Sequence, residues 1–294
     1  MNKADYFLGI DLGSSSVKMS VFDGGKGKTI ISCSYPDNEM NIFSPKSGWA
    51  EQEPDYWLEC IITCFKILNK KIDFSLIASI GISYQMHGLV LLDKNKKILR
   101  PSIIWCDSRA VDIGKKASEK LDSKIISSHL LNSPGNFTAS KLKWIMNNQP
   151  KIYNSIYKVM LPGDYIAYRL TGNMSTTESG LSEGILWDFK NKNISNDVIS
   201  YFGFKRDLFP PILSSFGDHG YISKKISKTF GFNENTKLTY RAGDQPNNAF
   251  SLNVLYPGEI AATAGTSAVI YAVTDKNIYD KNERINTFLH CNNS

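Results

Sequence analysis

A short turn near the amino terminus holds the first residues that could do chemistry. The segment that begins at Asp11 reads Asp-Leu-Gly-Ser-Ser-Ser between two apolar stretches. Gly13 leaves the N–H groups of the turn unhindered, and these groups can face an anion together with the hydroxyls of Ser14 and Ser15. Asp11 can hold Mg²⁺ beside phosphates, and Lys18 can add positive charge. The turn is predicted as a phosphate cradle, although a tight hairpin explains the same residues equally well.

A second turn of the same composition lies near the other end of the chain. It reads Gly-Thr-Ser and begins at Gly265 and Thr266. Two hairpin turns that close on one phosphate chain from two domains form a more specific arrangement than either turn alone. Gly265 and Thr266 are therefore predicted as a second phosphate loop.

Asp244 is the candidate for proton transfer. It follows Gly243 at the end of an apolar stretch and precedes a polar run. A carboxylate at a strand-to-helix junction can accept the proton of a hydroxyl that attacks a γ-phosphoryl group. It can equally cap the helix that follows. Position alone does not separate these two interpretations.

A polar segment at residues 84–88, Tyr-Gln-Met-His-Gly, interrupts two further apolar stretches. His87 follows Met86 there and can face a cleft, but a lone histidine is more often structural, so both interpretations stay open. No role is assigned to the other histidines, which have no partners at ligand spacing: His129, His219 and His290.

Two tryptophans and an acid–base pair accompany these segments. Trp49 and Trp105 are predicted as core or cleft-wall aromatics, with a core role as the default and stacking on a sugar face as the alternative. Asp107 and Arg109 are predicted as a solvated helix start. Their place after a strand makes a sugar-side contact the alternative.

Alternating and helical patterns define the elements that must position these residues. Two hairpins in succession predict a three-stranded meander, and the overall architecture is expected to be mixed α/β. The expected strands are 6–10, 17–22, 29–35, a strand around 80–82, 89–92 and 238–242, with a terminal hairpin over 259–273. The expected helices are one that begins at Pro54, 140–147, 164–170 closed by Gly172, and 249–253.

Composition excludes several classes of protein. The 294 residues are 42% hydrophobic, enough for buried cores, and the net charge of +6 is scattered, so a nucleic-acid partner is not expected. The sequence shows no apolar run long enough to span a membrane and no signal peptide, so a cytoplasmic protein is expected. The five cysteines form no C-x-x-C pair. Cys60 and Cys64 would share a helix face, and buried reduced thiols are favoured over a metal site.

The ordered set of motifs resembles the FGGY carbohydrate kinases, and xylulokinases within that family. The matching segments are residues 9–15, 49–52, 85–88, 161–165, 170–172, 243–244 and 265–267. The resemblance implies an α/β fold of the actin-like, ribonuclease H-like ATPase type, with a mixed sheet flanked by helices. It also implies a truncated second domain, with the sugar-binding domain over 1–253 and the first strands of the nucleotide-binding domain over 254–294.

The resemblance also implies roles for individual residues. Asp244 would be the catalytic base, Met86 and His87 would line the sugar site, and Asp11 would attend Mg²⁺ and the phosphates of ATP. The first phosphate loop would hold Gly13, Ser14, Ser15 and Lys18, and the second Gly265 and Thr266.

The segment at Met86 and His87 also bears on the substrate. Glycerol kinases carry Arg-Glu at these two positions, so glycerol is not expected. Gluconokinases carry Met-His followed by Ser, and stay the main competitor. Xylulokinases commonly follow the base with Asn, whereas Gln245 stands here, and Gln245 or Asn247 is expected to replace that sugar contact.

The resemblance therefore predicts ATP-dependent phosphorylation of a sugar, with D-xylulose converted to D-xylulose 5-phosphate. The truncated chain by itself is expected to be inactive. A sugar-binding module without catalysis and a structural or regulatory actin-like protein are the alternatives from other classes. A homodimer stays open.

Overall fold

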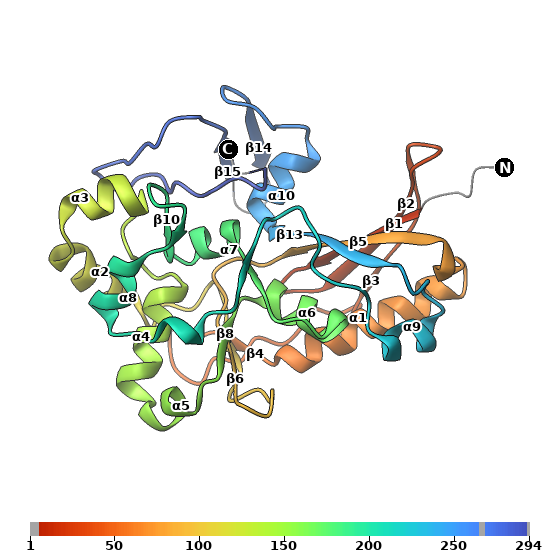
Figure 1. The fold of residues 1–294 in the computed structure, drawn as a ribbon, viewed down its shortest axis with the longest axis horizontal. Coiled ribbons are helices and arrows are strands. Elements are labelled where there is room, and N and C mark those ends of the chain that lie inside the picture. Colours follow the sequence, from red (N-terminus) through yellow and green to blue (C-terminus); the bar gives the residue numbers. More distant parts are fainter. Residues whose placement is uncertain (1–5, 265–267, 293–294) are drawn as a thin grey trace.

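The fold is built around one mixed sheet of five strands. The computed structural model describes residues 6–264 and 268–292. The strand order is β13-β5-β1-β2-β3, seen nearly edge-on in Figure 1. These strands are β1 (Tyr6–Leu12), β2 (Val17–Asp23), β3 (Lys28–Tyr35), β5 (Ile77–Tyr84) and β13 (Lys237–Gly243).

The first three strands form the predicted antiparallel meander. In β1 the buried side chains are Leu8, Ile10 and Leu12, and the residues between them are more exposed. Strand β2 repeats this alternation. Since successive side chains of a strand point to opposite faces, one face of the meander is apolar and lies on the core. The prediction of the three strands is confirmed.

Strands β5 and β13 extend the sheet in the parallel sense. β1 pairs with β5 in parallel, and β5 pairs with β13 in parallel. Their carboxyl ends are in register, with Leu12 opposite Tyr84 and Tyr84 opposite Gly243. Three chain segments therefore leave the sheet side by side at one edge.

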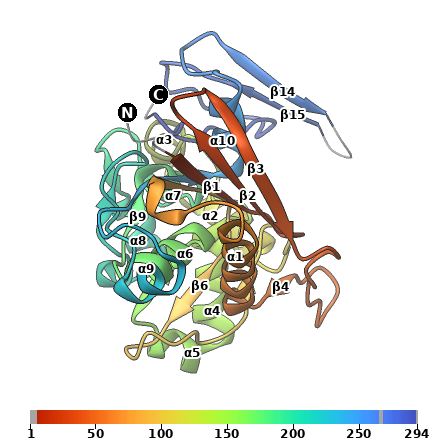
Figure 2. The same cartoon turned by 90° about the vertical axis from the view of Figure 1, so that its right-hand side faces the viewer.

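Helix α1 (Pro54–Asn69) covers the apolar face of the meander. Pro54 stands in the first turn, where its missing N–H costs nothing. The buried stripe Trp57, Ile61, Phe65 and Leu68 then recurs at helical spacing and faces the sheet. Figure 2 shows α1 beneath the strands of the meander. The helix predicted from Pro54 is confirmed.

Two more helices lie on the same side of the sheet, α6 (Pro162–Thr171) and α9 (Lys224–Phe230) (Figure 1). Asp164 in the first turn of α6 accepts the N–H of Leu161 at 3.2 Å. Gly172 ends this helix with φ 88°, a left-handed conformation that favours glycine. The predicted helix and its glycine cap are both confirmed.

A second group of elements has its own apolar core, on the side of the molecule away from α9 (Figure 1). Its helices are α2 (Val111–Lys120), α3 (Ser123–Ile125), α4 (Thr138–Asn148), α5 (Pro150–Ser155), α7 (Glu178–Glu183) and α8 (Asn196–Phe202), with a π-helical turn at Ile126–Leu130. The remaining short strands form two-stranded pairs: β4 (Glu51–Gln52) with β7 (Ser102–Ile103), β6 (Val90–Leu92) with β8 (Lys158–Met160), β9 (Thr176–Thr177) with β12 (Ile212–Leu213), and β10 (Trp187–Asp188) with β11 (Asn193–Ile194).

Beyond β13 the chain forms helix α10 (Asp244–Ser251) and the hairpin of β14 (Ile260–Ala264) and β15 (Ala268–Ala272) (Figure 2). The hairpin was predicted. The helix, however, begins five residues before the predicted start at Ala249, because Pro246 is tolerated in a first turn and Gly243 takes the cap position. Across the described residues, every helix is too short or too polar to cross a membrane.

Candidate functional site

The candidate site lies at the carboxyl ends of β1, β5 and β13. Because these ends are in register, the turn after Leu12, the segment after Tyr84 and helix α10 after Gly243 meet at one edge. Crevices at the carboxyl ends of parallel strands are the usual ligand sites of α/β sheets. The structure thus brings together Asp11, the neighbours Met86 and His87, and Asp244, which come from three distant parts of the sequence.

The predicted phosphate turn is a tight reversal between β1 and β2. The N–H of Gly13 donates to the carbonyl of Ser16 at 3.1 Å. A Cβ added to Gly13 would lie 3.2 Å from that carbonyl, so a larger residue would crowd the turn. Lys18 is exposed and stands opposite Asp11 in the register of the two strands. The turn can therefore present backbone donors, hydroxyls and one cation to an anion.

Gln52 ties this turn to the segment after β5. Its Nε2 donates to the carbonyl of Ser14 at 2.7 Å. Its Oε1 accepts from Trp57 Nε1 and from Gln85 Nε2, each at 3.1 Å. Sequence reasoning assigned Gln52 no role, although the segment 49–52 was part of the family resemblance. The buried amide fixes the spacing of two loops that come from different strands.

Met86 and His87 lie beside the start of α10. Met86 is buried, and a Cβ added to Gly243 would lie 2.5 Å from Met86 Cγ. His87 Nδ1 lies 2.9 Å from the carbonyl oxygen of Glu183. Since a carbonyl only accepts, Nδ1 carries the hydrogen, and Nε2 of the neutral ring is an acceptor. Burial, followed by the charge of Lys141, lowers the pKa of His87 to about 3, which keeps the ring neutral.

A segment from the end of the chain completes the wall around His87. The ring of Phe288 lies 5.5 Å from the imidazole, and that of Phe137 lies 4.7 Å from it. The neighbouring Thr287 donates its N–H to Asn132 Oδ1 at 2.8 Å. Residues far along the chain therefore contact the predicted sugar site.

Asp244 opens helix α10 but does not cap it. The cap position belongs to Gly243, so the helix-cap interpretation of Asp244 is wrong. Burial, followed by the charge of Asp11, raises the pKa of Asp244 to about 6. Gln245 follows it and is half-buried. A carboxylate with this pKa is largely ionised at neutral pH and accepts a proton readily.

Asp11 is half-buried at the end of β1. Burial raises its pKa, while the ammonium of Lys18 and the hydroxyl of Ser83 act in the opposite direction. Its negative charge in turn raises the pKa of Asp244. A divalent cation near the two carboxylates would offset that repulsion, and carboxylate oxygens are the ligands Mg²⁺ prefers. The residues present therefore fit the predicted ion.

Asp107 and Arg109 contradict the prediction of a solvated helix start. The side chains of both are fully buried, and the guanidinium makes paired bonds of 2.7–2.9 Å with the carboxylate. Arg109 also contacts Glu51 at 2.6 Å and stacks on Trp49 at 3.8 Å. The chain buries this pair because Trp49, which is only half-buried itself, covers the guanidinium.

Trp105 was predicted in the core and is 53% exposed instead. Its indole Nε1 donates to Ser14 Oγ at 3.3 Å, so the ring stands beside the phosphate turn. The predicted second phosphate loop, Gly265 and Thr266, lies outside the described residues.

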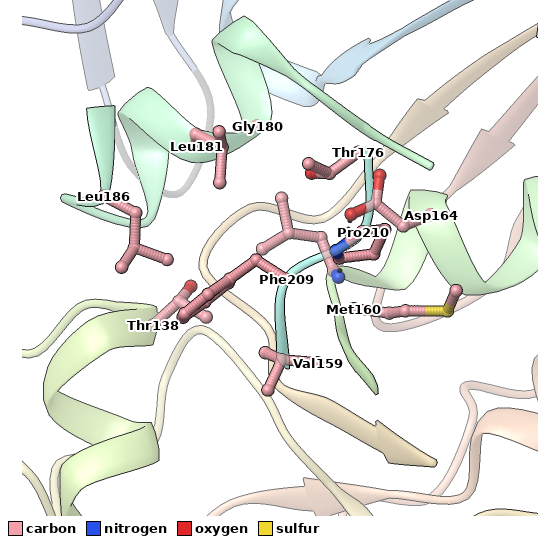
Figure 3. A pocket seen from close by; sticks show the side chains of 11 residues that line it. Thr138, Val159, Met160, Asp164, Thr176, Gly180, Leu181, Leu186, Phe209 and Pro210 are labelled. Carbon is pink, nitrogen blue, oxygen red and sulfur yellow. Dashed lines mark hydrogen bonds between the residues drawn. The ribbon is translucent and has the colours of Figure 1, made fainter. Parts of the chain in front are cut away.

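The small cavity lined by Thr138, Leu161 and Asp164 lies apart from these residues. This void of about 10 Å³ lies between α4, β8 and α7, with mostly apolar walls (Figure 3). Figure 3 shows the carboxyl of Asp164 turned toward Thr176 at its edge. This volume holds one water molecule at most, so the void cannot take a sugar.

Comparison with known proteins agrees with the geometry. The profile of the FGGY family of carbohydrate kinases, N-terminal domain, matches residues 6–251. The chain belongs to this family. Xylulose kinase from Haemophilus influenzae is 31% identical over 298 residues, a match that covers 98% of this chain and 60% of that enzyme. Xylulose kinase from Staphylococcus xylosus is 29% identical, with 97% and 59% covered.

Solved structures of FGGY kinases share the fold. A "xyloylose kinase" from Brucella ovis superposes with a TM-score of 0.90 at 27% identity, covering 97% of this chain and 58% of that one. Gluconate kinase from Lactobacillus acidophilus gives 0.83 at 25%, covering 91% and 54%. The predicted actin-like fold with a mixed sheet is confirmed. The chain spans somewhat more than half the length of these relatives.

Proposed function

We propose that this chain is the sugar-binding part of an ATP-dependent sugar kinase whose substrate is a ketopentose, D-xylulose in the first place. The single observation that carries the proposal is the meeting of Asp244, His87 and the turn after Asp11 at one sheet edge. The similarity to xylulose kinases over nearly the whole chain supports the choice of sugar.

Asp244 acts as the base in this proposal. Its carboxylate takes the proton of the terminal sugar hydroxyl as that oxygen forms a bond to the γ-phosphorus of ATP. The bond between the γ-phosphorus and the bridging oxygen breaks, and ADP leaves with that oxygen. Such help is worth roughly 10²–10⁴-fold in rate. The pKa of about 6 suits the role at neutral pH.

The sugar is held on the other side of Asp244. His87 Nε2, the bare acceptor of the neutral ring, accepts a hydrogen bond from a sugar hydroxyl. Met86 provides an apolar contact, and Gln245 supplies an amide to the sugar. His87 and Gln245 are both only partly buried, which supports direct contact with a ligand.

The phosphates of ATP lie against the turn after β1. Gly13, Ser14 and Ser15 offer N–H and hydroxyl donors, and Lys18 adds a cation. Gly265 and Thr266 would provide the second loop, and the domain boundary would fall between 253 and 254. Asp11 would hold Mg²⁺, which neutralises charge on the phosphates when bound.

Calorimetric titration of the chain with D-xylulose, D-gluconate and glycerol, each with and without Mg-ATP, tests the sugar site. Heat with D-xylulose alone supports the proposal. The gluconate arm tests the runner-up, a gluconokinase, which the fold similarity to a gluconate kinase favours. Sugar binding without any turnover of ATP would favour the alternative function, a sugar-binding module without catalysis.

The base is tested by Asp244→Asn in a protein that carries this chain together with the rest of the kinase. The amide keeps the shape but cannot take the proton. We expect kcat to fall roughly 10²–10⁴-fold while KM for the sugar changes far less. Retained turnover would show that another group is the base.

A further inference from the structure

His87 has a backbone conformation that a histidine rarely adopts. Its φ is 60°, in the left-handed region, and it stands between Met86 and Gly88 at the proposed sugar site. Residues other than glycine persist there only when their surroundings hold them in place.

Two buried ionisable side chains bind the N–H and the carbonyl of His87. Lys141 Nζ donates to the carbonyl of His87 at 2.9 Å. Glu183 Oε1 accepts the N–H of His87 at 3.2 Å, and the main-chain oxygen of Glu183 accepts from the ring Nδ1 at 2.9 Å. Every polar group of His87 except Nε2 is therefore engaged by one of these two residues.

The same two residues reach the neighbouring parts of the site. Lys141 Nζ also donates to the carbonyl of Ile104 at 2.9 Å. Ile104 directly precedes Trp105, whose indole contacts the predicted phosphate turn. A Cβ added to Gly243 would lie 2.5 Å from Glu183 Oε2, so this carboxyl packs against the residue before Asp244. Both side chains thus stand directly behind the segments that would touch the substrates.

Burial makes these side chains costly for the fold. Lys141 is 0% exposed and Glu183 is 1% exposed. Burial lowers the pKa of Lys141 to about 8 and raises that of Glu183 well above its usual value. Apolar residues at such positions often give equal or greater stability. Their hydrogen bonds to one strained residue point to a role in positioning.

We propose that Lys141 and Glu183 are positioning residues that hold His87 left-handed with Nε2 bare, and thereby set the affinity of the site for its sugar. This inference rests on the proposed function, because it assumes that His87 contacts the sugar. Neither residue touches the substrate itself; both act through His87.

The first test compares sugar affinity across four variants of the chain by calorimetry with D-xylulose. Glu183→Ala and Lys141→Met each remove one hold on His87, and we expect the sugar Kd to rise roughly tenfold, as for loss of a buried hydrogen bond. Glu183→Gln keeps the acceptor and is expected to stay within about twofold of the wild type. Glu178→Ala, at the other end of the same helix, is the matched control and should leave Kd unchanged.

The rescue by glutamine separates positioning from a general loss of fold. If Glu183→Ala and Glu178→Ala weaken sugar binding equally, or if neither Glu183→Ala nor Lys141→Met weakens it, the proposal is wrong. If Glu183→Gln binds as poorly as Glu183→Ala, the acceptor to His87 is not what matters, and the proposal also fails.

A second measurement does not need the sugar. Amide hydrogen exchange of His87 should be slow in the wild type and in Glu183→Gln, and roughly tenfold faster in Glu183→Ala, since its N–H loses its acceptor. Unchanged exchange in Glu183→Ala overturns the proposal. If the wild type binds none of the sugars, the proposed function fails while this measurement still decides whether Glu183 holds His87.

Discussion

Arg109 offers the sharpest stability prediction, because its guanidinium is buried among two carboxylates and two aromatic rings. Its guanidinium is 0% exposed and bonds to Asp107 and to Glu51. The rings of Trp49 and Trp144 lie 3.8 and 5.0 Å from it. The change to test is Arg109→Met, which keeps much of the length and removes the charge.

The cost follows from what the change leaves behind. Removing one partner of a buried ion pair costs about 3–5 kcal/mol, because the other charge stays buried without compensation. Asp107 would still accept the N–H of Ala50 at 2.6 Å, and Glu51 would still pair with Arg100. These remaining contacts place the expected loss near the lower end, about 3 kcal/mol in the free energy of unfolding.

Urea unfolding followed by circular dichroism measures this loss. The slope of the transition should stay constant, so that the change in midpoint reports stability. Arg284→Met is the matched control, since Arg284 pairs with Asp280 but its side chain is 72% exposed. An exposed pair of this kind contributes little, and we expect no resolvable change of the midpoint.

A double variant tests whether the two buried charges act as a pair. The double variant Asp107→Asn with Arg109→Met should cost less than the sum of the two single changes. Each single change already removes the interaction between the two side chains, so the sum counts that loss twice. The reasoning is refuted if Arg109→Met costs less than about 1 kcal/mol, or if it behaves like Arg284→Met.

Two further predictions concern packing and pH. Gly163→Ala should lower the free energy of unfolding by about 1–3 kcal/mol in urea titration, because the added Cβ would lie 2.1 Å from Tyr84. Gly217→Ala is the control, since Gly217 has open space around it and its replacement should not lower the stability. Equal effects of the two changes would contradict the packing argument. Burial, followed by the charge of Arg241, lowers the pKa of His219 to about 4, so the folded ring stays neutral while the unfolded ring takes a proton below about pH 6.5. Relative to His219→Asn, the wild type should therefore lose roughly 2 kcal/mol of stability between pH 7.5 and 4.5. If the difference in stability between the two proteins does not change with pH, the histidine is not neutral in the folded state.

Local patterns were sufficient where local forces decide the structure. The meander follows from alternate burial in two short strands, and α1 follows from a proline start and an apolar stripe. Gly172 was predicted as a helix end and has the left-handed φ expected there. The start of α10 was missed because a polar run with a proline reads as a loop, although a first helical turn tolerates both.

Buried polar residues could not be found from the sequence. Gln52, Lys141 and Glu183 look like surface residues, and their bonds to Gln85 and His87 span 33 to 96 positions along the chain. Asp107 and Arg109 were assigned to solvent because Glu51 and Trp49, which contact the pair, stand far from it along the chain. A polar residue is identified as buried only by the groups that satisfy it, and no local pattern encodes them.

The sequence by itself determined the family and the segments that carry the candidate chemistry, because each motif is short and continuous. The assignment of roles to Asp11, His87 and Asp244 stays a prediction. Tertiary structure alone decided how these segments meet, since the register of β1, β5 and β13 sets which ends lie together. It also decided which charges are buried and how His87 is held, because those depend on hydrogen bonds between helices and strands that the chain order keeps apart.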